Sequence, residues 1–450
     1  MPPSFLSSFP AIHIAKSRIP KVLKTSTIFL ELPRQSDMAI PTAAGALPHD
    51  PPRDDAAPPP VRAGWALFDM RVATGHLAST AAAVAACKTS NGWDVRVSPR
   101  RVATPPACSL VQLYTDDDVT EEPIVVAAGG DLLLIHMAVA VVGTFFTEEL
   151  LLHNFFVYKA DPESPSLPFL PPPPGDWKAQ PAETGIARKG NEFVVANLRT
   201  HMDVVDVATM REVEVAVLWL YRSSSSANEQ WETKQLAMPY TPREGIVEVF
   251  WHTDTLFSSR GFICWVDFHR GIIYCDVFSP DLEPGFLRFP GIEMWRGDRE
   301  SPNMNRAVSV CRGHVKFVDI DDEGCFCRDD NYDGCTITTS ALKLPEFEWE
   351  EEAPLRLTDL LSLPRYQESL LPRAVPILPI VEMEEDNILH FIVNGPGFFD
   401  KAWMVTVDMK NKSLVQYALY ENPIEAKDCS AYDLSNVFLE IPFVSTQLFH

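Results

Sequence analysis

The feature that most constrains this chain is a hairpin pattern that recurs along it. In its clearest copy the apolar run 262–267 ends on an acidic residue, 268–271 form a polar turn, and 272–276 form a second apolar run. Val, Ile and aromatic residues between Gly, Asn and Asp turns are typical of short paired strands. Further copies of this order span 403–417, 215–236 and, more weakly, 155–170. The pattern predicts an all-β fold.

A further strand precedes each hairpin, so the chain reads as six units that repeat roughly every 45–60 residues. The units lie near 61–118, 122–174, 185–240, 246–291, 305–360 and 375–420. One small sheet cannot bury both faces alone, whereas sheets stacked around a common axis bury them and leave only short edges. We therefore predict a β-propeller-like ring of about six small antiparallel sheets. A pair of β-sandwiches is the competing fold, because short strands and turns serve both.

Two segments depart from the repeat. Residues 359–371 are predicted to form a loop helix that Pro364 breaks. Residues 431–449 are predicted to supply the strand that closes the ring against the first unit.

The first 60 residues differ from the rest and are predicted to be a disordered or low-complexity N-terminal extension, with the propeller-like domain at 61–450. Residues 1–37 carry five basic side chains and two acidic ones, and 41–60 are rich in Pro, Ala and Asp, as linkers are. Met38 offers a second start site, which would make the upstream stretch a gene-model extension. Organelle import through residues 1–37 is the other interpretation.

The charge balance limits the classes of partner. The chain has 38 basic and 61 acidic side chains, a net charge of −23. Phosphate binding needs a basic stripe, and the sequence has none, so we expect no nucleic-acid partner. The densest acidic runs, 346–352 and 382–386, are predicted to be solvated faces.

Apolar runs and cysteines bear on location. The longest apolar run, 132–146, falls short of the roughly 18 residues that span a bilayer, so no membrane partner is expected. Nine scattered cysteines without a secretory leader predict reduced thiols. We expect an intracellular protein, cytoplasmic or nuclear.

The same residues carry a family resemblance. The stretch 261–277, GFICWVDFHRGIIYCDV, resembles the hallmark of a plant family expanded in grasses, the domain of unknown function 1618 (DUF1618). Further matches lie at 65–69, 190–198, the Trp231 strand and 286–290, so the resemblance covers roughly 61–445. It implies a propeller-like β fold, similar in style to domains that follow F-boxes in plant proteins, and no established activity. Residues 1–60 are too rich in proline for an F-box, so a ubiquitin-ligase adaptor role is not supported.

The search for chemistry predicts no catalytic residues, no cofactor and no metal site. The sequence has no nucleophile elbow, zinc-protease helix, phosphate loop or dinucleotide-binding turn. Residues 329–334 match the first half of a calcium loop, but its twelfth position would be Ser340, which cannot supply a bidentate carboxylate. Cys325 and Cys327 lack the spacing of a zinc pair. We predict an exposed hairpin loop there.

Four hallmark residues are interpreted as a structural signature: Trp265, Asp267, Gly271 and Asp276. A tryptophan inside a strand usually fills the space between sheets. An aspartate beside a glycine turn usually accepts hydrogen bonds from the turn's backbone.

Together these features predict a non-catalytic scaffold that binds a protein or peptide, a basic one given the charge. Loops such as 222–230, 319–335 and 395–401 would form its recognition surface. The alternative is a propeller hydrolase or lyase acting on a small molecule or glycan in the central channel. That alternative predicts His, Asp, Glu or Arg side chains converging at one mouth of the channel.

Overall fold

The fold comes from a computed structural model of the 450-residue chain. Contacts divide the chain into two compact units, Met1–Pro60 and Val61–His450. The structure describes residues 64–79, 85–101, 103–116, 119, 121–140, 151–159, 164–172, 181–206, 211–223, 231–239, 251–292, 302–321, 332, 334–343, 346–395, 401–420 and 443–447. The predicted disordered extension at 1–60 lies outside them.

The strands of the described residues group into six small sheets in chain order. Sheet 1 holds β1 (Trp65–Gly75), β2 (Ala85–Lys88), β3 (Asp94–Arg101), β4 (Ser109–Thr115) and β26 (Phe443–Gln447). Sheet 2 holds β5 (Ile124–Gly129), β6 (Leu132–Ala140), β7 (Leu151–Lys159) and β8 (Phe169–Leu170). Sheet 3 holds β9 (Thr184–Lys189), β10 (Glu192–Asp206), β11 (Arg211–Arg222) and β12 (Glu232–Ala237).

The second half of the chain continues the series. Sheet 4 holds β13 (Thr255–Ser259), β14 (Phe262–Asp267), β15 (Gly271–Asp276) and β16 (Gly285–Arg288). Sheet 5 holds β17 (Arg306–Cys311), β18 (His314–Asp321), β19 (Thr336–Lys343), β20 (Glu348–Glu351) and β21 (Leu355–Arg356). Sheet 6 holds β22 (Ile377–Val381), β23 (Ile388–Asn394), β24 (Ala402–Asp408) and β25 (Ser413–Leu419). The predicted all-β fold of about six small sheets is confirmed.

Helices are short and few among the described residues. They are the 3₁₀ turns η1 (Leu77–Ser79), η2 (Pro181–Glu183) and η3 (Pro302–Met304) and the helices α1 (Leu357–Leu361) and α2 (Pro364–Gln367). The predicted broken helix is confirmed, because Pro364 occupies the first turn of α2, where its missing N–H costs nothing. Within the described residues, none of these helices has the length and apolar content needed to cross a membrane.

One pairing in sheet 1 departs from the predicted antiparallel pattern. β1 runs parallel to β4, whereas β3 and β4 are antiparallel. After β1 the chain crosses to the outer edge through η1 and builds β2, β3 and β4 inward, so β4 arrives beside β1 in the same direction. β1 also pairs with β5 at Arg71 and Ile124, which joins sheets 1 and 2 into one nine-stranded sheet.

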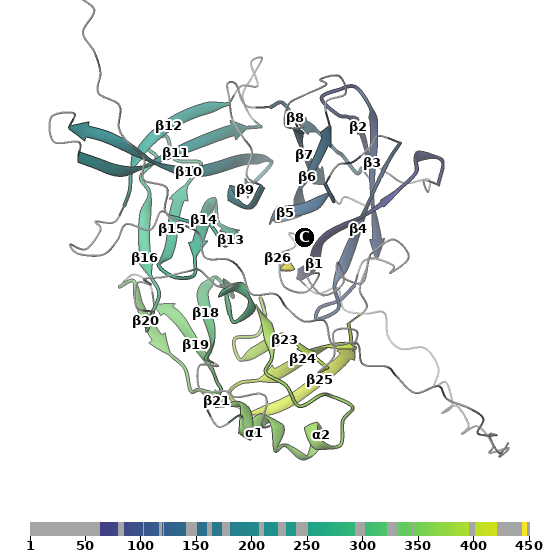
Figure 1. The fold of residues 1–450 in the computed structure, drawn as a ribbon, viewed down its shortest axis with the longest axis vertical. Coiled ribbons are helices and arrows are strands. Elements are labelled where there is room, and N and C mark those ends of the chain that lie inside the picture. The colour runs from purple at the N-terminus through teal and green to yellow at the C-terminus, as the bar shows by residue number, and fades with distance from the viewer. Residues whose placement is uncertain are drawn as a thin grey trace, which may run out of the picture. The chain divides into compact units, whose positions relative to one another are not determined.

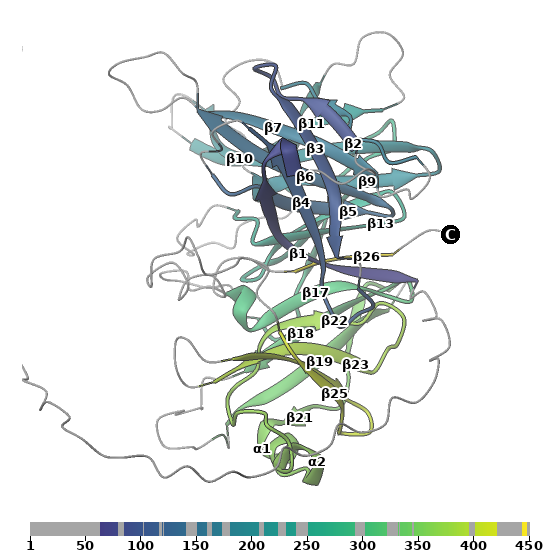
Figure 2. The same ribbon diagram turned by 90° about the vertical axis from the view of Figure 1, so that its right-hand side faces the viewer.

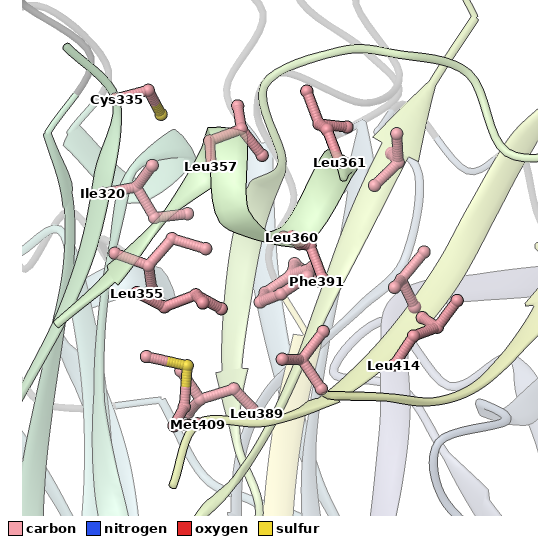
Figure 3. Packing of buried hydrophobic residues seen from close by; sticks show 14 of the residues in the cluster. Ile320, Cys335, Leu355, Leu357, Leu360, Leu361, Leu389, Phe391, Met409 and Leu414 are labelled. Carbon is pink, nitrogen blue, oxygen red and sulfur yellow. The ribbon is translucent and has the colours of Figure 1, made fainter. Parts of the chain in front are cut away.

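Apolar side chains join each sheet to the next, so that the six sheets form a ring (Figure 1). The six clusters among the described residues centre on Leu113 and Phe156 (sheets 1 and 2), Phe155 and Ile186 (2 and 3), Leu218 and Trp265 (3 and 4), Val266 and Phe317 (4 and 5), Ile337 and Phe391 (5 and 6), and Met404 and Leu67 (6 and 1). Figure 3 shows the cluster of sheets 5 and 6, where Leu357, Leu360 and Leu361 of α1 point into the core. Burial of each such side chain contributes about 1.5–3 kcal/mol.

The two ends of the described chain meet in sheet 1. β26 pairs with the start of β1 in antiparallel register, from Trp65 opposite Gln447 to Asp69 opposite Phe443. Thr446 Oγ1 also donates a hydrogen bond to the carbonyl oxygen of Gly130 in sheet 2 (2.9 Å). Figure 2 shows the yellow β26 beside β1. The predicted closing strand is confirmed at 443–447, while 431–442 lie outside the described residues.

Sheets 3 to 6 share one orientation. η2, just before β9, contacts β13, and its Glu183 lies near His252, which precedes β13. Arg306, the first residue of β17, donates from Nη1 to the carbonyl oxygen of Phe268 after β14 (2.9 Å). The backbone N–H of Arg312, after β17, donates to the carbonyl oxygen of Met383, after β22 (2.9 Å). β9, β13 and β17 therefore begin at the same end of the ring, which we call the mouth. The turn between β14 and β15 lies at the mouth as well.

Candidate functional site

Trp265 anchors the hallmark hairpin to the neighbouring sheet. Its side chain is fully buried among the apolar residues of sheets 3 and 4. Its indole Nε1 donates to the carbonyl oxygen of Glu183 in η2 (2.9 Å). The burial explains why a large aromatic residue stands here, and the hydrogen bond fixes η2 over sheet 4.

Asp267 organises the turn between β14 and β15. The side chain is fully buried. It accepts hydrogen bonds from the backbone N–H of His269 (2.9 Å) and from that of His252 (3.2 Å). The carboxylate therefore satisfies backbone donors of its own turn and of the segment that leads into β13.

Gly271 stands where a side chain would not fit. Its φ is +155°, and an added Cβ would lie 2.1 Å from the carbonyl oxygen of Leu287 in β16. The hallmark needs glycine at this position because two backbones approach closely.

Asp276 holds the other end of the hairpin. Its Oδ1 accepts from the backbone N–H of Phe278 (2.9 Å), while its carbonyl oxygen accepts from Ser279 N–H (3.2 Å). These contacts describe a capped turn rather than a ligand site.

Asp267 belongs to a group of three largely buried charged residues at the mouth. Arg270 Nε lies 3.6 Å from Asp267 Oδ2, and Arg270 Nη1 lies 3.9 Å from Glu214 Oε2 of β11. Glu214 Oε1 accepts from the backbone N–H of Trp251 (2.7 Å). Two carboxylates thus share one guanidinium across sheets 3 and 4, so Arg270 offsets charge on both of them.

Glu183 is the mouth residue best suited to acid–base chemistry. Burial raises its pKa to about 7, although Arg199 and His252 oppose the shift. Its Oε2 is buried and lies 3.9 Å from Arg199 Nε, beyond hydrogen-bond distance. His252 beside it is 63% exposed and pairs with Asp254 (Nδ1 to Oδ1, 3.0 Å). Sequence reasoning missed Glu183, because its surroundings come from η2, β10 and the segment before β13.

A small cavity opens among the strands that line the ring at the mouth. Its volume is about 60 Å³, room for a few water molecules. It is lined by Thr255, Phe268, Asn303, Arg306, Ala307, Val308, Ser309, Leu378, Pro379, Ile380, Val381, Phe443 and Ser445. The ionised residue in this lining is Arg306, whose Nε donates to Asp319 Oδ1 (2.8 Å).

Two predictions about acidic runs are wrong in part. Glu382 belongs to a run predicted to be a solvated face, yet it is 9% exposed and its Oε2 lies 2.8 Å from Nε2 of the buried His390. Glu352, from the other run, pairs with the buried Lys316 (Oε1 to Nζ, 2.9 Å). A charge run that follows a strand can place one member against the core, beside a buried residue with which it pairs.

A second buried polar group lies where sheets 6 and 1 meet. Arg71 Nε and Asp69 Oδ1 are 3.0 Å apart, and Arg71 Nη2 donates to the hydroxyl oxygen of Tyr420 (2.8 Å). Tyr420 OH also hydrogen-bonds Asp69 Oδ2. Burial, with Asp69 beside it, raises the pKa of Tyr420 above its usual range. The sequence analysis included Asp69 only as the last residue of the family match at 65–69.

The remaining predicted segments fall partly outside the described residues. These are the calcium-like stretch at 329, 331 and 333, Cys325 and Cys327, and most of the three predicted recognition loops. The flanks of 319–335 and 395–401 follow the second strands of sheets 5 and 6, at the mouth, whereas 222–230 follows the third strand of sheet 3, at the opposite end. The described flanks of these loops therefore lie at two different ends of the ring. Among the described residues, no three His, Cys, Asp or Glu side chains gather as a metal site requires.

The sequence matches one family model. The family described as "Protein of unknown function (DUF1618)" matches residues 265–390, which start at the hallmark tryptophan. The resemblance to this family predicted from 261–277 is confirmed over residues 265–390. No curated protein matches the sequence.

Several solved structures are similar at low identity. The β-fructofuranosidase of Bombyx mori is 10% identical with a TM-score of 0.23, covering 67% of this chain and 62% of that protein. A prolyl endopeptidase is 12% identical with a TM-score of 0.29, covering 76% of this chain and 42% of that protein. A putative 6-phosphogluconolactonase from Bacteroides uniformis is 9% identical with a TM-score of 0.32, covering 79% of this chain and 97% of that protein. The chain spans less than two thirds of the first two proteins, and likenesses this weak decide nothing about activity.

The close approach at Gly271 predicts a large cost for Gly271→Ala. The methyl group would meet backbone atoms of β16 that cannot rotate away, so we expect a loss of about 2–4 kcal/mol in the free energy of unfolding. Gly190→Ala is the matched control: its φ is +61°, but nothing lies within 4 Å, so backbone strain alone should cost about 1 kcal/mol. Urea unfolding of both variants measures the difference, and equal losses would contradict the packing at Gly271.

The raised pKa of Glu183 predicts a dependence of stability on pH. The folded state holds the proton up to about pH 7, whereas the unfolded state releases it near 4.5, so this residue's contribution falls as pH rises between those values. Glu183→Gln keeps a neutral side chain, so the variant should be more stable than the native chain by about 1–3 kcal/mol at pH 8 and equal to it at pH 4. Urea unfolding across this range checks it, with the exposed Glu192→Gln as control. A constant difference at all pH values would contradict the assignment.

Proposed function

We propose that the protein is a non-catalytic binding module for another protein or peptide inside a plant cell, in the cytoplasm or nucleus. The observation that carries the proposal is the described cavity among β13, β17, β22 and β26. Its volume of about 60 Å³ is much smaller than the roughly 300–1,000 Å³ of small-molecule sites. Arg306, the ionised residue of its lining, is held by Asp319 and by the carbonyl oxygen of Phe268.

Three thiols and one hydroxyl among the described residues are poorly suited to act as nucleophiles, which supports the same conclusion. Burial raises the pKa of the Cys87, Cys264 and Cys311 thiols to about 12, which keeps them protonated at neutral pH. Thr406, His390 and Glu382 form a hydrogen-bonded chain, with Thr406 Oγ1 3.0 Å from His390 Nδ1. Thr406 and His390 are each 2% exposed, so a substrate has no access to them.

The charge of the chain supports a basic partner. The net charge of −23 gives a field that attracts positively charged segments and repels nucleic acids.

The cysteines support the proposed location inside the cell. The six described cysteines are free thiols, as in proteins of reducing compartments.

A peptide array tests the binding role. We expect the full chain to bind lysine- and arginine-rich peptides with micromolar affinity that falls as salt rises, and to ignore acidic peptides of equal length. The control is an unrelated protein of equal net charge. Equal retention by the control would show that only bulk charge acts, and would contradict the proposal.

One observation favours the alternative, a hydrolase or lyase acting on a small molecule or glycan. Glu183 has a pKa of about 7 and stands at the mouth beside the exposed His252, as a general acid would. Assays with chromogenic glycosides, esters and lactones test it. If the native chain turns over one of these substrates and Glu183→Gln does not, the hydrolase or lyase function replaces the binding role. If the native chain shows no turnover but binds the peptides, the binding role is supported.

A further inference from the structure

An aromatic row lies on the outside of sheets 4 and 5. The Phe347 ring, 50% exposed, lies parallel to the Tyr274 ring at 6.3 Å and 10°. Tyr274 in turn contacts Phe262 of β14, which is 37% exposed, with the ring centres 6.3 Å apart. We call these three residues, with Glu346 and Glu348 beside them, the Phe347 surface. Exposed aromatic side chains of this kind are enriched where proteins bind one another.

The backbone at Phe347 has an unfavourable conformation for a bulky residue. Its φ is +58°, in the left-handed region that glycine adopts freely and a bulky residue does not. The Phe347 N–H donates to the carbonyl oxygen of Lys343 (2.9 Å), which closes the turn between β19 and β20. Glycine would adopt this φ without strain, so the turn itself does not require a phenylalanine.

The row rests on a rigid base. Tyr274 packs against the cluster of sheets 4 and 5, in which the rings of Phe289 and Phe317 stack with centres 4.2 Å apart. Trp349, next to the surface in β20, donates from Nε1 to the carbonyl oxygen of Arg288 (2.7 Å) and joins the two sheets. An exposed ring on so fixed a support loses little freedom when a partner covers it.

The rim of the surface is acidic. Glu346 and Glu348 flank Phe347 and are exposed. Neither has an ion-pair partner within the part of the chain that the structure describes, because the neighbouring Lys343 pairs with Glu350 (2.9 Å). The partner that complements this rim carries positive charge.

We propose that the Phe347 surface binds a lysine- or arginine-rich segment of a partner protein, with one large side chain of the segment stacked on Phe347. A guanidinium suits both features, since it stacks on an aromatic face and pairs with a carboxylate. The inference rests on the proposed binding function and names where and what it binds.

Phe347→Gly tests the aromatic contribution, with the basic peptides of the array as probes. The affinity of the full chain should fall about tenfold or more, while the variant unfolds at the same temperature as the native chain or a higher one, because the strain is relieved. Trp93→Ala removes an aromatic side chain that is 48% exposed in the turn between β2 and β3, and it should leave affinity unchanged. Unchanged affinity in Phe347→Gly would overturn the inference.

A paired charge change tests the rim. The double variant Glu346→Gln with Glu348→Gln should bind the peptides about tenfold more weakly at low salt and depend less on salt. Glu121→Gln with Glu122→Gln changes the net charge equally at exposed positions before β5 and should have little effect. Equal effects of the two pairs would overturn the placement but leave the binding function standing. No binding by the native chain would refute the binding function itself.

Discussion

The structure depends on the pairing of β26 with β1. Residues 443–447, at the end of the described chain, add the strand β26 to sheet 1, which β1 begins. Sheet 6 packs against this completed sheet 1 through Met404 and Leu67. Without this pairing both terminal sheets would expose an apolar face and an open edge, which small sheets cannot sustain alone. Closure makes the six interfaces mutually supporting, because each sheet is then covered on both sides.

The hallmark of the family follows from this requirement for packing between sheets. Trp265 fills the interface of sheets 3 and 4, Asp267 satisfies the backbone at the mouth, and Gly271 permits β16 to approach. Each of these roles is structural, so the hallmark itself says little about a ligand. The features that point to binding lie beside it, in the exposed Phe347 and its acidic neighbours, where the backbone has a φ that glycine would adopt without strain.

Local patterns in the sequence were enough to predict the units, since period-two strands and Gly or Asp turns are set by neighbouring residues. The broken helix at Pro364 and the closing strand near the C-terminus were predictable for the same reason. The parallel pairing of β1 with β4 was not, because it depends on the order in which the chain fills sheet 1. Nor were the burial of Glu382 and the raised pKa of Glu183, which arise from residues that only the fold brings together.

Amide hydrogen exchange on a chain that ends at residue 442 tests ring closure most directly. Removal of β26 should expose the amides of β1 and of the adjoining β5 to exchange orders of magnitude faster, and a synthetic peptide of residues 443–450 should restore their protection as its concentration rises. Protection of β1 and β5 that is the same with and without residues 443–450 would show that the ring does not depend on its closing strand.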